Sequence, residues 1–217
     1  MPIAPDPSRA TPADRPRRPV RRWFAALIVA GGAALAVVPA ATATTSAHRH
    51  RGARIDRACP GADARVGHAS PELLRSAVVC LINRARARHH LPALKASPLL
   101  NRSAQGWTNV MVSSDQFTHG ANFAGRISAA GYVWRSAGEN IATGFATPRA
   151  VVNAWMGSPG HCENILNPSY RNVGTGVSTR AVRGYATGVG TWTQDFALGM
   201  HQSAPSGNAA PMDGCPY

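Results

Sequence analysis

Two histidines and one glutamate lie in apolar, turn-rich stretches and are the residues best suited to chemistry: His119, Glu139 and His161. Two imidazoles and a carboxylate are able to hold a divalent ion such as zinc and leave a coordination position for water. Such a trio would serve a metal-dependent hydrolase, with Glu139 as general base on a metal-bound water. The same side chains are also able to form a hydrogen-bonded network that fixes loops, with Glu139 paired to a histidine. The residue types leave both alternatives open.

Both alternatives require the three side chains to converge in one cleft, and the neighbouring residues favour this. A glycine or a Pro-Gly pair, which is a loop-forming signal, adjoins each of them: Gly120, Gly138 and Pro159-Gly160. Loops on a rigid scaffold are where cleft residues usually gather. Trp192 and Gln194 share one face of an expected strand, so we expect them to line or floor the same cleft.

The commonest enzyme signatures are absent from the sequence. It contains no GxSxG elbow, HExxH helix, P-loop or GxGxxG motif, which removes the usual indications of serine esterases, zincins and nucleotide enzymes. Cys162 follows His161 directly, so the two side chains diverge and do not suit a Cys/His dyad. We therefore expect Cys162 to be oxidised rather than nucleophilic.

Helices and a β-hairpin are expected to position these residues. Ser70, Ser97 and Thr147 are each followed by proline, as at helix N-termini, and apolar residues then recur at spacings of three and four. A short helix over 122–130 would end at Gly131. Residues 172–177 and 185–198 predict two strands, because they are rich in Gly, Thr, Val and aromatic residues around a turn-prone segment. In the second strand, Trp192, Gln194 and Phe196 would share one face and Thr191, Thr193 and Asp195 the other.

The N-terminus has the layout of a signal peptide over residues 1–47. Arginines that include Arg21-Arg22 precede an apolar stretch over 23–40, and small residues follow it. We expect export to the outside of the cell and cleavage after Ala43 or Ala47. A membrane anchor normally needs about 20 continuous apolar residues, whereas this stretch is shorter and broken by Gly and Pro, so no stable membrane insertion is expected after cleavage. The arginine pair leaves the twin-arginine export route open.

The positive charge is concentrated near the N-terminus. The 217 residues include 23 Lys and Arg against 10 Asp and Glu, but from Ala58 onward only 13 face 7, which leaves +6. Residues 48–70 are expected to be a flexible basic segment and 201–217 a loosely held tail. No aromatic residues interleave the charges of the basic segment to stack on bases, so nucleic acid is not an expected partner.

Four cysteines, an even number, are expected to form disulfides in an oxidising compartment: Cys59, Cys80, Cys162 and Cys215. Their separations of 21, 82 and 53 residues do not match the CxxC spacing of zinc sites. Three pairings are open on this evidence.

Several motifs in order carry a family resemblance: LIN at 81–83, AGENIA around Glu139, AWMGSPGH ending at His161, NILNP, and WTQDF in the last strand. Together they resemble a bacterial member of the CAP superfamily, also called the SCP domain. The resemblance covers about residues 73–198 and implies a CAP domain over 71–200. It implies an α+β fold, a three-layer α-β-α sandwich with a small, largely antiparallel sheet between helices and a central cleft.

The resemblance also implies site residues. In many members the cleft holds two His and two Glu; His119 and Glu139 match the first His and the GEN glutamate, and His161 matches the histidine typical of bacterial members. The sequence departs from the family where eukaryotic members carry a His before TQ, since Thr191 and Trp192 stand there. Gln194 would replace it only in part, and the second Glu has no clear counterpart.

For the disulfides and the function, the resemblance implies more than the spacing does. Bacterial relatives often have Arg where Cys162 stands, which favours Cys162 with Cys215 and Cys59 with Cys80. The family favours a secreted extracellular binding module whose cleft takes a lipid, a wall glycan or a protein. The alternative is a metal-dependent extracellular hydrolase that uses His119, Glu139 and His161 with a divalent metal such as zinc.

Overall fold

The computed structural model describes residues 59–204 and Cys215. The expected signal peptide, the residues before 59 and most of the expected tail lie outside this part of the chain. The helices are α1 (Pro71–Arg88), α2 (Pro98–Ser114), α3 (Phe123–Ala129), α4 (Pro148–Met156) and α5 (Pro159–Leu166). The strands are β1 (Lys95–Ala96), β2 (Trp134–Thr143), β3 (Asn172–Ser178) and β4 (Thr191–Gly199).

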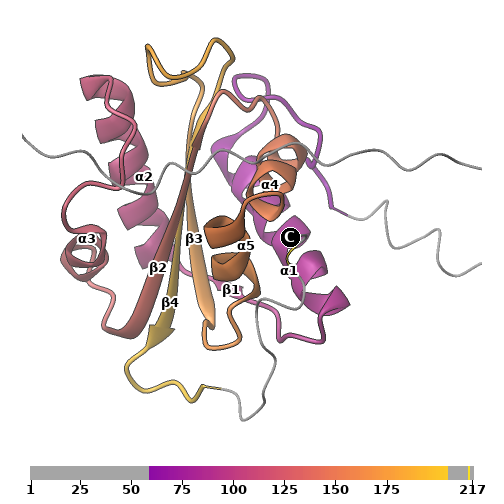
Figure 1. Ribbon diagram of the computed structural model, residues 1–217, viewed down its shortest axis with the longest axis vertical. Helices are drawn as coiled ribbons and strands as arrows, with labels where there is room; N and C mark the ends of the chain where they lie inside the picture. The colour runs from indigo at the N-terminus through magenta and orange to yellow at the C-terminus, as the bar shows by residue number, and fades with distance from the viewer. Residues whose placement is uncertain (1–58, 205–214, 216–217) are drawn as a thin grey trace, which may run out of the picture. The chain divides into compact units, whose positions relative to one another are not determined.

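The strands form one sheet in the order β1-β3-β4-β2, so β2 is an edge strand. β4 pairs antiparallel with both β2 and β3, while the short β1 pairs parallel with β3. Figure 1 shows the sheet edge-on, with α2 and α3 on one face and α1, α4 and α5 on the other. The expected α+β three-layer α-β-α sandwich with a largely antiparallel sheet is confirmed.

The helix starts follow the predicted capping signals. The side chains of Ser70, Ser97 and Thr147 accept hydrogen bonds from the backbone N–H groups three residues later, and proline follows each in the first turn. Asn122 caps α3 in the same way, and Gly131 follows that helix with a positive φ of 88°. These four helices therefore begin where local sequence alone directs them.

Three elements were not predicted: the two-residue β1, β2 and α5. β2 lies where glycine beside Glu139 indicated a loop, and α5 lies where Pro159-Gly160 indicated one. Gly138 is needed for space rather than for a turn, because a Cβ there would lie 2.5 Å from the Tyr170 hydroxyl and 2.6 Å from Asn164 Oδ1. Pro159 occupies the first turn of α5, where a missing N–H costs nothing.

Helix α2 lies unusually close to the sheet. A Cβ on Gly174 or Gly176 would overlap the α2 backbone at Leu100 and Ala104. The absence of a side chain at both strand positions therefore allows the helix to pack this close to the sheet. Beyond the short β1, the free edge of β3 is covered by side chains of α2. Asn101 Oδ1 accepts from Thr175 N at 2.8 Å and Gln105 Oε1 from Val177 N at 3.0 Å.

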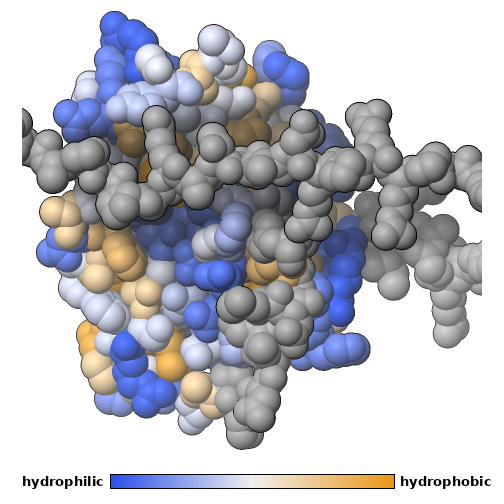
Figure 2. Space-filling view, in the orientation of Figure 1, coloured by the Kyte–Doolittle hydropathy of each residue, from blue (hydrophilic) through white to orange (hydrophobic). Residues whose placement is uncertain are grey.

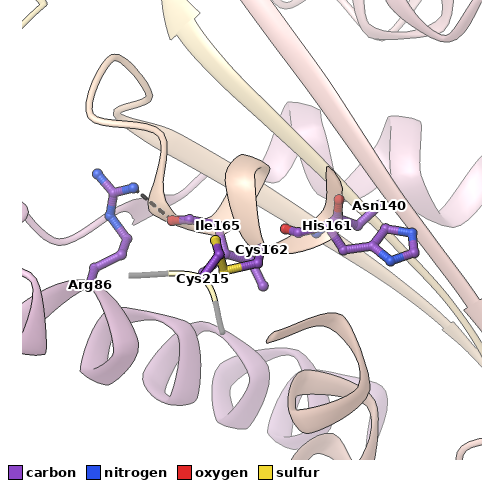
Figure 3. Close-up of a disulfide and its surroundings, with 6 residues drawn as sticks. All are labelled: Arg86, Asn140, His161, Cys162, Ile165 and Cys215. Carbon is purple, nitrogen blue, oxygen red and sulfur yellow. Dashed lines mark hydrogen bonds between the residues drawn. A yellow bond between two sulfur atoms is a disulfide. The ribbon is translucent and has the colours of Figure 1, made fainter. Parts of the chain in front are cut away.

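Both expected disulfides are present, Cys59 with Cys80 and Cys162 with Cys215. The second joins the tail to α5, and Figure 3 shows the His161 ring and the Cys162 sulfur pointing to opposite sides of that helix. Buried Arg86 of α1 holds the end of α5 by donating to the carbonyls of Ile165 and Asn167, each at 2.8 Å.

The expected flexible segment over 48–70 is packed in its described part. Val66 is 6% exposed, its N–H donates to the Ala146 carbonyl at 2.9 Å, and Cys59 is disulfide-bonded. Residues 59–70 thus belong to the folded unit, because a disulfide and an apolar side chain fix them to it. In the part of the chain that the structure describes, no helix is long and apolar enough to cross a membrane.

Candidate functional site

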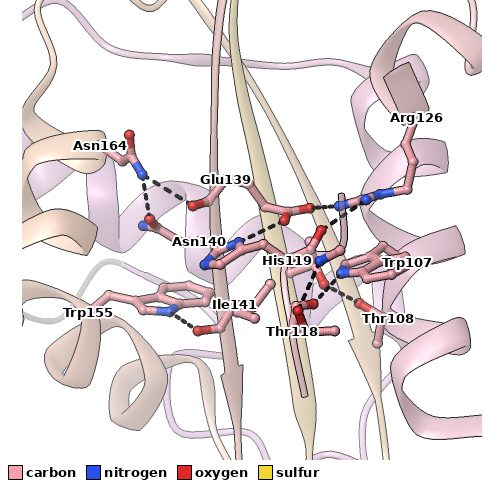
Figure 4. A network of polar contacts seen from close by, with 12 residues as sticks. Trp107, Thr108, Thr118, His119, Arg126, Glu139, Asn140, Ile141, Trp155 and Asn164 are labelled. Atoms are coloured by element: carbon pink, nitrogen blue, oxygen red, sulfur yellow. Dashed lines mark hydrogen bonds and ion pairs between the residues drawn. The ribbon is translucent and has the colours of Figure 1, made fainter. Parts of the chain in front are cut away.

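Glu139 lies in the middle of the edge strand β2, with its carboxylate on the α2 and α3 side of the sheet (Figure 4). Its side chain is 1% exposed. The Nδ1–H of His119 donates to Glu139 Oε1 at 2.8 Å, and Arg126 Nη2 donates to Oε2 at 2.5 Å. Both carboxylate oxygens are therefore engaged, which stabilises a buried negative charge.

Arg126 organises the loop that carries His119. Its guanidinium lies 3.9 Å from the centre of the Trp107 ring, and its Nη1 donates to the His119 carbonyl at 3.0 Å. Trp107 in turn donates from Nε1 to the Thr118 carbonyl at 2.9 Å. The His119 side chain remains 50% exposed, so the network leaves one face of the imidazole open to solvent.

Asp195 of β4 is the cross-strand neighbour of Glu139 and faces the same side of the sheet. It is 1% exposed. Burial, followed by the charge of Glu139, raises the pKa of Asp195 to about 8, although the nearby Ser103 hydroxyl and Arg126 guanidinium act in the opposite direction. The buried site therefore favours the protonated form of Asp195 beside Glu139.

Asn140, the residue after Glu139 in β2, faces the other helical layer, which contains α1, α4 and α5. Asn140 Nδ2 donates to the His161 carbonyl at 3.1 Å. Its Oδ1 accepts from Asn164 Nδ2 at 2.9 Å (Figure 4). Asn164 also donates to the Glu139 carbonyl at 3.2 Å. These amide contacts fix α5, and with it His161, against the edge strand.

His161 lies in the first turn of α5 and is partly buried. Burial, and then the electrostatic effect of the neighbouring His119, lowers the pKa of His161 below its usual value of 6.5. The two histidines are thus close enough to influence one another across the edge of β2. At neutral pH, His161 is an uncharged imidazole.

The three predicted residues do not form a metal-ligand set. Within the described residues, no three His, Cys, Asp or Glu side chains are placed to hold an ion. Glu139 is paired with His119 as one alternative predicted, but the guanidinium of Arg126 occupies its second oxygen. The tentative metal assignment of His119, Glu139 and His161 does not fit this geometry, because a cation would have to displace Arg126.

A groove of about 340 Å³ runs along the edge of β2 beside His161. Aromatic and aliphatic side chains dominate its lining, namely Phe117, Ile141, Ala142, Phe145, Ala154, Trp155 and Tyr185; Thr143, Ser158 and His161 also contribute. The ring centres of Phe117 and Tyr185 lie 5.8 Å apart at its wall. The groove is at the small end of the usual size range for ligand pockets.

Trp192 and Gln194 are placed differently from the expectation that they line the cleft. Both are 0% exposed on the face of the sheet opposite to the Glu139 carboxylate, and neither borders the groove. Trp192 belongs to the main core and donates from Nε1 to the Phe145 carbonyl at 2.8 Å. They share a face as predicted, but helices cover that face at both positions.

Two residues of the site were missed from the sequence, Arg126 and Asp195. Asp195 stood in the WTQDF motif, on the strand face opposite to Trp192. An acid within a strand expected to be buried was a signal that could have identified Asp195 as a site residue. Arg126 had no such signal, since an arginine in a short helix is usually solvated. Only the fold shows that α3 brings it to Glu139.

Comparisons with known proteins agree with this architecture. The family described as "CAP: Cysteine-rich secretory protein family" matches residues 79–196. Protein YkwD of Bacillus subtilis (strain 168) is 36% identical over 123 residues, which are 55% of this chain and 45% of that protein.

Two solved structures are also similar. An extracellular SCP-domain protein from Bacillus anthracis str. Ames has a TM-score of 0.51 and 25% identity over 59% of this chain and 44% of its own. An outer surface protein from Borrelia burgdorferi has a TM-score of 0.50 and 21% identity over 56% and 90% respectively, a likeness of fold alone. This chain spans less than half the length of YkwD and of the Bacillus anthracis protein. The family match extends over more than half of the chain and includes the strands and helices that build the site, so the chain belongs to the CAP, or cysteine-rich secretory protein, family.

Proposed function

We propose that the protein is an extracellular binding module whose groove beside β2 takes an elongated, largely apolar ligand such as the hydrocarbon part of a lipid. The lining of the groove is the observation that carries this proposal. Seven of its ten lining residues are aromatic or aliphatic, and His161 is the one imidazole among them. A wall glycan, by contrast, would require many hydrogen-bonding groups for its hydroxyls.

The polar cluster would orient the ligand rather than react with it. His161 borders the groove as a neutral imidazole, because burial lowers its pKa. A neutral imidazole offers one donor and one acceptor, and burying it beneath an apolar ligand costs less than burying a cation. A ligand with a carboxyl or hydroxyl group at one end would therefore place that group at His161.

The metal-dependent hydrolase is the weaker alternative on these residues. A general base needs a carboxylate that is free to take a proton from water, whereas both oxygens of Glu139 accept hydrogen bonds from His119 and Arg126. A substrate water would have to displace His119 or Arg126 to reach that carboxylate. We derive no reaction step from this arrangement.

Location outside the cell is part of the same proposal. The arginine-rich, apolar and small-residue layout of 1–47 is typical of an export signal. Two disulfides in the described residues suit an oxidising compartment. The similar protein of Bacillus anthracis is described as extracellular.

Filling the groove tests the proposal. Ala154 lines the groove from α4, whereas its neighbour Asn153 is exposed and does not border it. We expect a fluorescent fatty acid to bind the wild type. Ala154→Phe should weaken this binding by about tenfold or more, because the phenyl ring occupies groove space in which the ligand would bury apolar surface. Asn153→Phe should leave the binding unchanged, because its side chain lies outside the groove. Equal binding by all three proteins would contradict the proposal.

A further inference from the structure

Apolar and basic side chains gather together at one end of the sheet, around the mouth of the groove. This docking tip consists of the β3–β4 loop, residues 179–190, with the adjacent segments 65–68 and 115–117. Tyr185 is 58% exposed and Val189 is 42% exposed in the loop. Figure 2 shows hydrophobic and hydrophilic atoms side by side at this upper end, where Figure 1 places the loop.

Direct contacts join segment 115–117 to the β3–β4 loop, and segment 65–68 lies close to the same loop. Arg183 Nη2 lies 3.0 Å from Asp115 Oδ2, and the rings of Phe117 and Tyr185 are in contact. A Cβ on Gly67 would lie 3.8 Å from the Thr179 methyl group. The exposed apolar side chains are therefore part of a continuous surface and not isolated on separate loops.

The charge of the docking tip is positive. Its acid, Asp115, is paired with Arg183, and the adjoining Asp63 is paired with Arg149 at 2.7 Å. Arg65 and Arg180 are exposed there and have no acidic partner among the described residues. The surface thus offers an excess of cations beside exposed aromatic and aliphatic groups.

We infer that the docking tip binds the surface of an anionic lipid membrane and so presents the groove mouth to lipid. An amphipathic tyrosine and an aliphatic side chain enter the interfacial region, while arginines contact anionic headgroups. Tyr185 belongs both to the tip and to the groove wall, so a lipid would enter the groove beside this side chain. Only this last step rests on the proposed function; docking itself does not.

The opposite end of β2 provides a matched control. Val133 is 66% exposed and Arg135 is exposed beside it, at the other end of a strand about 30 Å long. We therefore compare Val189→Ser/Arg180→Ser with Val133→Ser/Arg135→Ser. All four positions are exposed, so both double variants should fold. Every protein carries the same N-terminal residues, and their contribution cancels in the comparison.

The measurement is co-sedimentation of the purified chain with vesicles of phosphatidylcholine alone or mixed with phosphatidylglycerol. We expect stronger binding to the anionic vesicles, about tenfold loss in Val189→Ser/Arg180→Ser, and less than twofold change in the control. Equal losses in the two variants would overturn the inference. So would failure of the wild type to bind anionic vesicles, a result that would leave a protein partner as the occupant of the surface.

A second measurement separates this inference from the proposed function. Ala154→Phe should still bind vesicles but bind the soluble fatty acid more weakly. Val189→Ser/Arg180→Ser should bind vesicles more weakly but still bind the fatty acid. Loss of vesicle binding in Ala154→Phe would mean that the groove, and not the docking tip, contacts the membrane, which would overturn the inference. If the wild type binds anionic vesicles but does not bind the fatty acid, the proposed function is refuted and the docking inference stands.

Discussion

The paired strands β2 and β4 carry buried polar residues on both faces of the sheet. One cross-strand pair consists of carboxylic acids, and the next pair along the strands, on the other face, consists of amides. Glu139 and Asp195 form an acidic row on the α2 and α3 side. Asn140 and Gln194, continued by Thr175 of β3, form an amide row on the other side. Glu139 is 6% and Asp195 1% exposed, while all three residues of the amide row are 0% exposed.

The difference between the rows lies in what their partners must supply. The acidic row contains a charge, so it requires Arg126 and a second carboxyl that stays protonated. The amide row needs only hydrogen bonds, and it obtains them unevenly. Asn140 is bonded to α5, whereas neither polar atom of Gln194 has a partner among the described residues. One row is therefore sensitive to charge and pH, and the other is not.

The largest effect is expected from removing the cation of the acidic row. Arg126→Met would leave the Glu139 carboxylate buried without its ion-pair partner, so the free energy of unfolding should fall by about 3 kcal/mol or more. Chemical denaturation measures this loss. Adding Glu139→Gln to Arg126→Met should restore a large part of it, because no charge is then left buried. A double variant as unstable as Arg126→Met would show that packing on Trp107 dominates.

The acidic row should also make stability depend on pH. Because the pKa of Asp195 is raised from 3.8 to about 8, the folded chain binds a proton that the unfolded chain has released between those pH values. The free energy of unfolding should therefore fall as pH rises from about 4 to about 8, by at most about 1.4 kcal/mol per pH unit for one proton.

Asp195→Asn removes this slope and supplies the control. The pKa of His161 is lowered, so its contribution has the opposite sign and is lost as pH falls through its folded pKa. Both proteins retain His161, and the difference between their unfolding curves isolates Asp195. If the difference does not change between pH 4 and pH 8, the carboxyl is ionised in the folded protein.

The smallest effect is expected in the amide row. Gln194→Leu replaces an amide without protein partners by an apolar group of similar size, so stability should be unchanged or rise by about 1 kcal/mol. Asn140→Leu, the matched change at a bonded amide, should cost about 2 kcal/mol because it removes one hydrogen bond from the His161 carbonyl and one from the Asn164 amide. Comparable losses in both would show that Gln194 is hydrogen-bonded after all, for example to ordered water.

Local sequence was sufficient for the starts of α1, α2, α3 and α4 and for the strand alternation of β4. Ser70, Ser97 and Thr147 cap helices through their own side chains, and such signals need no tertiary context. The resemblance to the family supplied the layer arrangement. It also identified Glu139 and His119 as neighbours in space, although 20 residues separate them.

The remaining features depend on tertiary packing. Gly138 and Pro159-Gly160 resemble turn residues, but the first makes room for Tyr170 and the second starts a helix. That helices cover both faces of β4 was not readable from its alternation, so Gln194 was placed in the cleft when it lies in the core. Arg126 reaches Glu139 only because α3 folds over the edge strand.

Binding of the fluorescent fatty acid in the presence of a chelator, and again with added zinc, tests the central claim most directly. If the groove is a binding site oriented by a metal-free polar network, the dissociation constant should be the same in both conditions, since Glu139 is already engaged by His119 and Arg126. Binding that appears only with zinc, and disappears in His119→Ala and His161→Ala, would contradict the account and restore a metal centre.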